Sequence, residues 1–488
     1  MVTAKQTRMR LAKAERLRAG EAPRALELCS GCGGLSLGLA TAGFELTAHV
    51  EFDPVAAASY ALNFAPAGGK TEAWAKARDM VRYSADTLVG ELGLGSETSA
   101  SFDVLAAGLP CQAFARIGRS KLREIAGGKS DAFRLDPRAR LYRRFLAYVE
   151  DTQPLAIIIE NVPDILNFGG HNIPEEISET LEDLGYRSAY TILNAAYYGV
   201  PQVRERLFLI AYAKDLNIEP SFPGPSRYLE LPRGYEGSRR VALKHVSSDS
   251  PHFRQIHDPV ATLPAATGVR EALSDLPRIS EHRTDPAIIR KRRLSDELPY
   301  RSCDPLPDYA SLMRNWEGFE TVRGTDAHLV RLTPRDFPIF ARMPHGAEYP
   351  KAREIAEAML EEALDQAGIR SSGKLRSAIV PPYDPAKFPN RWWKLDPEKP
   401  SRTLTAHMGK DTYSHIHFDS RQCRTVSVRE AARLQSFPDG FKFAGAMNAA
   451  FRQIGNAVPP LLALAIATTI RSQLTQRQPM ASTVDQAA

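Results

Sequence analysis

The run Leu155-Ala156-Ile157-Ile158-Ile159 constrains the fold more than any other stretch of this chain. A strand without polar positions must be buried on both faces, as a parallel strand in the middle of an α/β sheet is. The run ends in Glu160, and Pro163 stops the strand. The sequence therefore predicts an α/β protein with a carboxylate at the carboxyl end of a central strand, where open sheets bind ligands. Burial there would raise the pKa of Glu160 enough for it to hold a proton.

A thiol follows the same pattern on another strand. The strand signal of residues 102–107 is ended by Gly108 and Pro110, which puts Cys111 on the loop at its carboxyl end. Such a cysteine is either a nucleophile with a stabilised thiolate or a small buried side chain. Glu160 favours the nucleophile, because two reactive groups on neighbouring strand ends form a site. Residues 115–140 are rich in Arg, Lys and Gly, which indicates either a basic lid over an anionic substrate or a plain surface loop.

A glycine turn between a strand and a helix indicates a nucleotide-like cofactor. Ala25–Leu28 is a short strand signal, and Gly31, Gly33 and Gly34 then allow backbone amides to approach a ligand closely. The helix that starts at Leu35 favours polar or anionic groups at its N-terminus. The spacing of Cys29 and Cys32 leaves a zinc or redox site as an alternative. No second cysteine pair lies at metal-ligand spacing, so we expect no metal.

Acidic residues follow the second strand signal, residues 44–53. Glu51 lies about 20 positions after the glycine turn and suits the hydroxyls of a ribose. Asp53 precedes a proline and is expected to cap the next helix. Near a third, weak strand signal, Asp79 with Met80 is expected at an adenine amino group. Asp86 is the alternative, although it reads better as a helix start.

Two arginines precede the strand signal of residues 207–211. Arg204 and Arg206 alternate along the chain, so their side chains are predicted on opposite sides. One can then face the site while the other binds a phosphate or a structural carboxylate.

Composition and charge exclude several classes of protein. Five cysteines in 488 residues make no disulfide framework, and no apolar run approaches the length of a membrane span. The basic N-terminus lacks the apolar core of a secretory signal. We expect a soluble protein of a reducing compartment. The net charge of +6 permits a polyanionic partner.

The chain divides by composition. Residues 1–23 read as a charged helical arm, either a solvated tail or a source of extra phosphate contacts. Proline and charge become dense after residue 216, which indicates a second domain. Its arginine–aromatic clusters are either ordinary surface, as most such clusters are, or contacts to nucleic acid, since Arg can read guanine edges. They are Arg314–Trp316, Arg331–Arg335 and Arg391–Lys394. The predicted domains are a basic arm 1–23, a catalytic domain 24–215, a second domain 216–395, a return to the catalytic domain 396–475, and a polar tail 476–488.

Together these stretches resemble the DNA (cytosine-5) methyltransferase family of the prokaryotic restriction-modification type. Any one motif is weak, and their order carries the resemblance. The motifs are Ser30-Gly31-Cys32-Gly33-Gly34, Glu51-Phe52-Asp53, Asp79-Met80, Pro110-Cys111-Gln112, Glu160-Asn161-Val162, Gln202-Val203-Arg204-Glu205-Arg206, Arg402-Thr403-Leu404-Thr405, Arg429 to Pro438, and Gly455-Asn456-Ala457-Val458-Pro459.

The resemblance implies an S-adenosylmethionine-dependent methyltransferase fold. It is Rossmann-like, with a mostly parallel seven-stranded sheet and a smaller, irregular target-recognition domain at 216–395. The catalytic domain is then built from both chain ends. S-adenosyl-L-methionine would lie across the first strand ends. The implied cofactor residues are Ser30, Gly31, Gly33, Gly34, Leu35, Glu51, Phe52, Asp79, Met80, Pro110, Asn456 and Ala457.

The same resemblance implies catalytic roles. Cys111 would add to C6 of a flipped-out cytosine, Glu160 would act at N3, and Arg206 at O2. Arg204 would hold a phosphate or the thiolate loop. Cys29 stands where the family often has Phe, which puts the packing on the cofactor in doubt. Leu109 and Ala115 are further departures that remove no reacting group.

The implied substrate is double-stranded DNA, with a cognate restriction endonuclease or other defence proteins as partners. A tRNA methyltransferase with the same motifs and a DNA-binding protein that has lost catalysis are the alternatives. The long variable segment argues against the first, and intact Cys111, Glu160 and Arg206 argue against the second. We expect a cytoplasmic monomer, associated with the nucleoid through DNA and not with a membrane.

Overall fold

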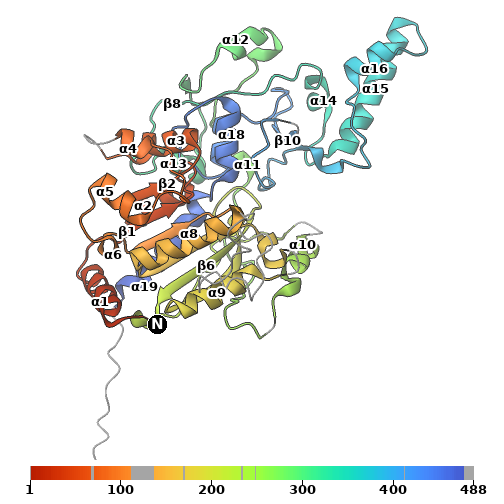
Figure 1. Ribbon diagram of the computed structural model, residues 1–488. Coiled ribbons are helices and arrows are strands. Elements are labelled where there is room, and N and C mark those ends of the chain that lie inside the picture. The colour runs from red at the N-terminus through yellow and green to blue at the C-terminus, as the bar shows by residue number, and fades with distance from the viewer. Residues whose placement is uncertain are drawn as a thin grey trace, which may run out of the picture.

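The computed structural model describes residues 2–66, 71–110, 137–168, 171–231, 235–247, 249–410 and 413–476. Cys111 and the basic segment after it lie outside these residues, so the predictions for them stay predictions. The fold has a sheet with helices on both faces and a second, more irregular part above it (Figure 1).

Six strands form the main sheet, in the order β2-β1-β3-β4-β6-β5. The first four neighbours are parallel, whereas β6 is antiparallel to both β4 and β5. The mostly parallel sheet was therefore predicted correctly, but six strands rather than seven occur in the described residues. β6 reverses direction because only ten residues separate it from β5, too few for the usual crossover between parallel strands. The strands are β1 (Arg24–Leu28), β2 (Glu45–Val50), β3 (Val104–Ala107), β4 (Ala156–Asn161), β5 (Tyr186–Asn194) and β6 (Glu205–Ala213).

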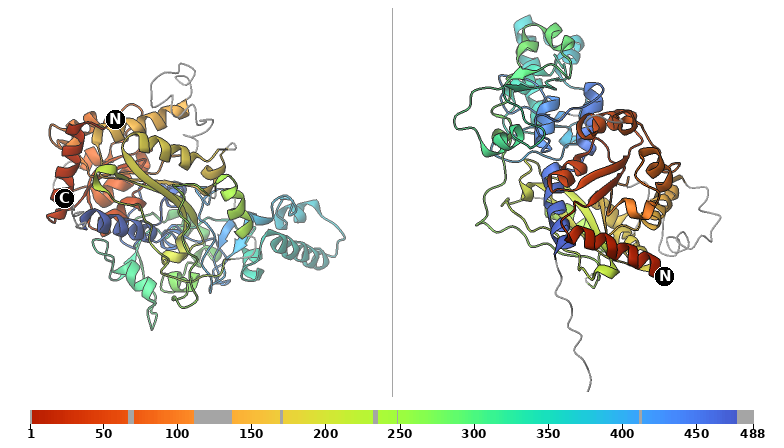
Figure 2. Two further views of the ribbon diagram at one scale, coloured as in Figure 1. Left: turned by 90° about the horizontal axis from the view of Figure 1, so that it is seen from below. Right: turned by 90° about the vertical axis from the view of Figure 1, so that its left-hand side faces the viewer.

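Helices cover both faces of this sheet. The apolar run before Glu160 is at most 1% exposed, as expected of a strand buried on both sides. α8 (Pro137–Thr152) and α9 (Ile173–Asp183) lie on one face, and α19 (Pro460–Thr475) lies on the other (Figure 2). α2 (Gly34–Thr41) packs on α19 so closely that a Cβ on Gly38 would lie 2.4 Å from the Cβ of Ala463. The last helix of the chain thus completes the first domain.

The N-terminal arm is a helix, α1 (Ala4–Arg18), and it is not the solvated tail that was one of the two interpretations of this segment. It packs beside α19 (Figure 2). Lys13 is 3% exposed and donates to the carbonyls of Phe102, Thr152 and Gln153. Arg16 forms an ion pair with the fully buried Asp103. The basic side chains of α1 therefore satisfy buried backbone and carboxylate groups at the edge of the sheet.

The second part has its own apolar cluster. It joins α11 (Val269–Leu273) and α13 (Asp308–Arg314) to α17 (Val428–Leu434) and α18 (Met447–Asn456). Of the segment predicted to return to the catalytic domain, α19 packs on the sheet, while α17 and α18 pack in this second cluster. The domain boundaries remain predictions.

A helical arm extends from the second part at the upper right of Figure 1. It consists of α15 (Tyr349–Ala367) and α16 (Gly373–Ile379), and it packs at its base on α14 (Phe337–Arg342) and β9 (Trp392–Lys394). The remaining elements are α3 (Pro54–Phe64), α4 (Thr71–Ala75), α5 (Ala85–Leu92), α6 (Thr98–Ser101), α10 (Tyr235–Ala242), α12 (Pro286–Lys291), β7 (Leu298–Pro299), β8 (Gly324–Thr325) and β10 (Tyr413–Ile416).

One stretch, Met447–Thr475, is long and apolar enough to cross a membrane by length and composition. It consists of α18 and α19, and 61% of its most apolar window is buried inside the protein. This burial is what a core helix of a folded domain shows.

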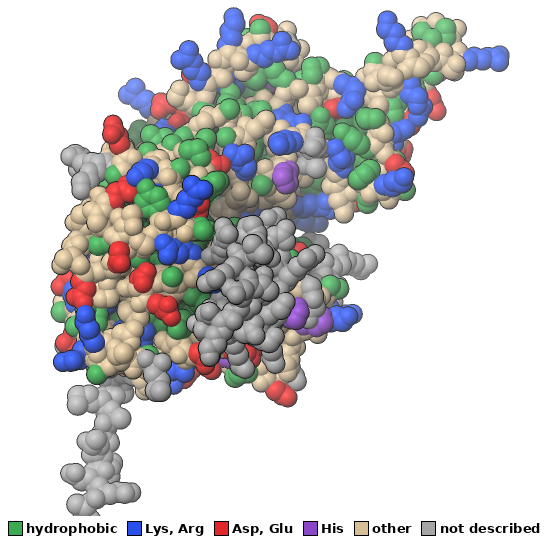
Figure 3. All heavy atoms as spheres, in the orientation of Figure 1, with side chains coloured by type: hydrophobic (Ala, Val, Ile, Leu, Met, Phe, Trp, Pro, Cys, Tyr) green, Lys and Arg blue, Asp and Glu red, His purple; other side chains and the backbone are tan. Residues whose placement is uncertain are grey.

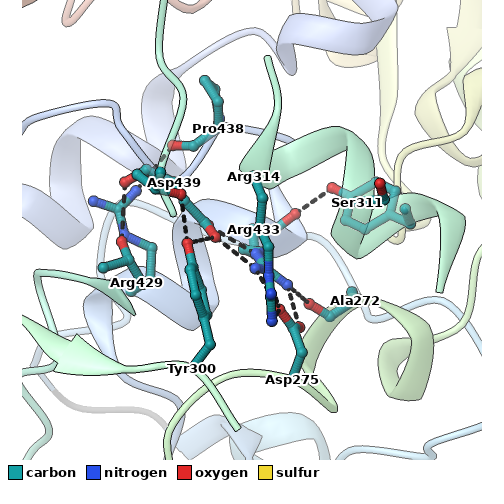
Figure 4. Close-up of polar contacts among 12 residues, drawn as sticks. Ala272, Asp275, Tyr300, Ser311, Arg314, Arg429, Arg433, Pro438 and Asp439 are labelled. Atoms are coloured by element: carbon teal, nitrogen blue, oxygen red, sulfur yellow. Dashed lines mark hydrogen bonds and ion pairs between the residues drawn. The ribbon is translucent and has the colours of Figure 1, made fainter. Parts of the chain in front are cut away.

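A buried ion cluster organises the second part (Figure 4). Arg433 of α17 is fully buried and donates to both carboxylate oxygens of Asp275, at 2.6 and 2.9 Å, and to Asp439 at 2.8 Å. Burial alone would raise the pKa of Asp439, but Arg433 lowers it below its usual value. Arg314 and Tyr300 add donors to the two carboxylates. Segments far apart in sequence are thereby held in one arrangement.

Candidate active site

A cavity of about 640 Å³ opens at the carboxyl edge of β1 to β4. Residues from both ends of the chain line it. The predicted site residues that it brings together are Ser30, Gly31, Gly34, Leu35, Glu51, Phe52, Asp79, Met80, Pro110, Glu160, Arg206, Asn456 and Ala457. Gly33 and Arg204 do not line it, and Cys111 lies outside the described residues.

The glycine turn is shaped by close packing. Gly33 has a φ of 96°, and a Cβ there would lie 2.3 Å from the ring of Phe64. A Cβ on Gly34 would lie 2.3 Å from the carbonyl oxygen of Val458. These two glycines therefore let the turn pack on α3 and on the returning chain end, while Gly31 leaves its backbone at the cavity.

Glu51 is fixed by two backbone amides. Its carboxylate accepts from the N–H groups of Gly31 and Asp53, each at 2.7 Å. Burial raises the pKa of Glu51, and the two amides oppose that rise. Asp53 caps α3 as predicted, accepting from Val55, and it also pairs with Arg452 at 2.9 Å. Glu51 is thus the oriented acceptor at this strand end, and Asp53 serves the helix.

Asp79 and Met80 lie in a loop between α4 and α5, so no strand forms at the weak strand signal. Asp79 accepts from the N–H of Val81, and the sulfur of Met80 lies 3.6 Å from that of Cys29. Burial raises the pKa of Cys29 to about 12, so its thiol stays protonated. No group of three His, Cys, Asp or Glu side chains that could hold a metal occurs within the described ranges, which leaves the zinc alternative without support.

Glu160 and Arg206 form an ion pair inside the cavity. Their strands are antiparallel neighbours, and Arg206 Nε lies 3.0 Å from Glu160 Oε1. Burial raises the pKa of Glu160 although Arg206 and Arg204 pull it down. Gly108 leaves room beside this carboxylate: a Cβ there would lie 3.8 Å from Glu160 Oε2. The pair offers a carboxyl group with a raised pKa and a cation next to it.

Arg204 points away from the cavity and is fully buried. It donates to the carbonyl oxygens of Leu404, Gly455 and Ala457, at 2.8, 2.9 and 3.1 Å. These bonds join the segment before β6 to the returning chain end, and the predicted contact of Arg204 with a phosphate or the thiolate loop stays a prediction. Alternation along the strand did predict that only one of the two arginines faces the site.

Sequence reasoning gave no role to Asn161, which ties two strand ends together. Its amide donates to the carbonyl of Leu109 at 2.8 Å, and its oxygen accepts from Val162. Leu109 belongs to the segment that leads to Cys111, so Asn161 positions that segment. An amide side chain directly after the strand-end acid was the available signal. Arg452, Gln453 and Gly455 of α18 also line the cavity.

Fold and site define an α/β enzyme with a cofactor cavity and a reactive edge built from both chain ends. The family model described as C-5 cytosine-specific DNA methylase matches residues 24–472. The chain belongs to this family and is a DNA (cytosine-5)-methyltransferase that uses S-adenosylmethionine.

Several relatives match nearly the full chain. A chain of Oceanobacillus iheyensis, predicted to be the type II methyltransferase M.OihORF3336P, is 37% identical over 93% of this chain and 96% of its own length. The type II methyltransferase M.AgeI of Thalassovita gelatinovora is 31% identical over 92% of this chain and 99% of its own. A crystal structure of a predicted DNA modification methyltransferase from an E. coli prophage shares the fold, with a TM-score of 0.56, 22% identity, and coverage of 93% of this chain and 100% of that one.

The residues of the cavity fit this cofactor. Its volume of about 640 Å³ is in the range of small-molecule sites. The carboxylate of Glu51 is an oriented acceptor for hydroxyl groups, and Phe52 offers a ring that is 73% exposed. Backbone rather than side chain borders the cavity at Gly31 and Gly108.

We predict that Arg204→Lys lowers the free energy of unfolding by about 2–4 kcal/mol, because buried carbonyls lose their donors. Cofactor affinity should fall as well, since Ala457 lines the cavity. Urea denaturation and calorimetric titration with S-adenosylmethionine measure the two effects. The matched control is Arg187→Lys, whose arginine pairs with Glu219 at the surface. A loss of kcat at unchanged stability would instead support a catalytic role for Arg204.

Proposed function

We propose that this enzyme methylates cytosine through a covalent adduct between Cys111 and C6 of a flipped-out base. The observation that carries the proposal is the buried pair of Glu160 and Arg206 in the same cavity as the cofactor turn. Pro110 lines that cavity, and Cys111 is the next residue. Cytosine C5 is a poor nucleophile until a thiolate has added at C6. A cysteine at this edge would supply that step.

Each reacting group has one task in the proposed reaction. The thiolate of Cys111 forms a bond to C6, and the electron pair of the C5–C6 double bond moves into the ring. Glu160 gives its proton to N3, and Arg206 donates to O2, so that the charge arriving on the base is neutralised. C5 would then take the methyl group of S-adenosylmethionine, whose methyl–sulfur bond breaks so that S-adenosylhomocysteine leaves. Transfer of the C5 proton to water would form the C5–C6 double bond again and break the C6–S bond, which returns the thiolate and lets Glu160 recover its proton from N3.

The cofactor contacts belong to the same proposal. The carboxylate of Glu51 would accept from the ribose hydroxyls and Asp79 from the adenine amino group. The ring of Phe52 would lie against the adenine. The remaining predicted contacts, Ser30, Gly31, Gly34, Leu35, Met80, Pro110, Asn456 and Ala457, line the same cavity. Gly33 would act by shaping the turn.

We infer that residues 216–395 form the target-recognition domain and that Arg391 reads a base. Its guanidinium lies 3.6 Å above the ring of Tyr383 and 5.7 Å from that of Phe388. No carboxylate in the described part of the chain pairs with it, whereas Arg335 and Arg402 are bound to Asp336 and Glu348. A guanidinium held flat by an aromatic ring, with donors to spare, suits bidentate binding to guanine.

The names of the relatives support a role in restriction-modification, because two of them are type II methyltransferases. We propose that the enzyme protects host DNA from a cognate endonuclease or a related defence system. It would act as a cytoplasmic monomer on double-stranded DNA. Flipping the target base out of the duplex would cost a few kcal/mol.

We predict that Cys111→Ser abolishes methyl transfer, because a hydroxyl is a far weaker nucleophile than a thiolate at neutral pH. The measurement is incorporation of tritium from labelled S-adenosylmethionine into genomic DNA and, in parallel, into tRNA. Cys303→Ser, which changes a partly exposed thiol away from the cavity, should retain full activity. Methylation of DNA by the Cys111→Ser protein would contradict the covalent mechanism. Label from the wild-type enzyme in tRNA alone would contradict the assignment of DNA as the substrate.

We predict that Glu160→Gln lowers kcat by about 10²–10⁴-fold, since an amide cannot give up a proton. In the wild-type enzyme the rate should fall as pH rises through the raised pKa of Glu160, because the proton needed at N3 is lost. The variant should lack this alkaline decline. Single-turnover methylation across the pH range measures both effects, with Glu45→Gln at the exposed start of β2 as control. Equal pH profiles for variant and wild type would contradict the role.

We predict that Arg391→Ala relaxes the recognition sequence at one guanine, with a loss of discrimination of roughly 10- to 100-fold for a lost bidentate pair. Bisulfite sequencing of plasmid DNA from cells that express each protein gives the recognition sequence and the methylated cytosine. Arg376→Ala, which removes an arginine paired with Glu357 on the arm, is the matched control. An unchanged recognition sequence in the Arg391 variant would show that this side chain reads no base.

A further inference from the structure

Positive charge is concentrated around α12. This helix contributes no residue to the lining of the active-site cavity. Residues 278–293 contain six Lys and Arg but only two acidic residues, a net charge of +4 in a chain whose net charge is +6. Five of the six side chains are exposed; Arg278 faces Asp419, and the other four are Arg283, Arg290, Lys291 and Arg293. We call these four the α12 patch. None of them lines the active-site cavity.

The segment that carries the patch is anchored rather than loose. Ile289 is buried with Ile279 and Val330. The ring of His282 packs edge-on against Phe337, with centroids 4.7 Å apart. Arg292 turns inward, where it donates to the carbonyl of His328 and to Glu281, each at 3.3 Å. These inward contacts anchor the segment, while Arg290 and Lys291 of the helix and the following Arg293 face the outside.

The charges of the patch are not neutralised within the described residues. Arg283 donates to the carbonyl of Arg421, and no ion pair with a carboxylate involves any of the four. Three arginines at the helical arm and its base differ in this respect, since Arg342, Arg353 and Arg376 pair with glutamates. Like charges held close together repel one another, so the patch gains most from a polyanionic partner.

A second hollow adjoins the patch, and three of the four arginines at its border pair with carboxylates. It has a volume of about 510 Å³ and is bordered by Arg270, Arg278, Arg301 and Arg421. Arg421, whose carbonyl Arg283 contacts, links the hollow to the patch. Lys and Arg side chains gather at the top of the molecule in Figure 3, where Figure 1 shows α12. The basic surface is therefore wider than one helix.

We propose that the α12 patch binds the phosphodiester backbone of duplex DNA at a second point, outside the cavity where methyl transfer occurs. Phosphate contacts of this kind carry no sequence information but raise affinity and make it depend on salt. DNA is the polyanion that the enzyme meets as its substrate. A second contact would hold the enzyme on DNA between recognition sequences and orient the duplex that enters the site.

The test compares two triple variants of the full chain. One removes three charges from the patch: Arg290→Gln, Lys291→Gln and Arg293→Gln. The matched control removes three exposed charges from the helical arm: Lys351→Gln, Arg370→Gln and Lys374→Gln. Fluorescence anisotropy measures binding to a labelled random-sequence duplex of about 40 bp at several salt concentrations between roughly 50 and 200 mM.

The patch variant should bind roughly 10- to 100-fold more weakly at low salt, and the slope of log K against log salt should fall by about 2–3. The control should bind like the wild type. Equal binding by patch variant and wild type, as expected if the patch serves an acidic protein, would overturn the proposal, and so would an equal loss in the control. Because the readout is binding, the result is independent of the mechanism proposed for Cys111.

Discussion

The three hydrogen bonds of Arg204 are the constraint on which the active site depends. The side chain leaves the segment before β6 and reaches the carbonyls of Leu404, Gly455 and Ala457, more than 190 residues further along the chain. Gln202 adds a bond to the carbonyl of Leu434. Asn456 and Ala457 border the cofactor cavity, and this buried guanidinium helps to hold their segment in place. A cavity shared by both chain ends therefore rests on polar contacts that are fully removed from solvent, where each donor is costly to lose.

Buried arginines also hold together the second part of the molecule. Arg424, Arg429 and Arg433 of the α17 region are fully buried, and each pairs with a carboxylate. Pairs of this kind add little net stability, since the removal of both charges from water offsets their attraction. They specify geometry instead, because any other arrangement leaves a buried charge unpaired. Among the described residues between 216 and 348 the helices and strands are short. The buried ion pairs therefore fix the positions of the segments here, as the sheet does in the first part.

The sequence predicted the features whose signals are local. The apolar run before Glu160, the glycine turn and the cap at Asp53 each depend on neighbouring residues, and all lie as expected. The docking of Lys13 depends on carbonyls about 90 to 140 residues away, which no pattern within α1 reveals. The partners of Arg204 are equally distant. The direction of β6 follows from its short link to β5. For Cys111 the sequence remains the source of the prediction.

The pairing of each arginine says more about function than the net charge does. Arg424 and Arg433 have full sets of acceptors inside the protein, and Arg204 donates to three buried carbonyls; none of the three is exposed, so none presents a donor at the surface. Arg206 pairs with a single carboxylate at the cavity, and that carboxylate has a raised pKa. In the proposed reaction this guanidinium would donate to an oxygen of the substrate. Arg391 and the α12 patch have no carboxylate partners among the described residues, so their positive charge would be free for the proposed contacts with DNA. In a protein that binds a polyanion, the unpaired cations identify the binding surface, and the paired ones identify the frame that holds it in place.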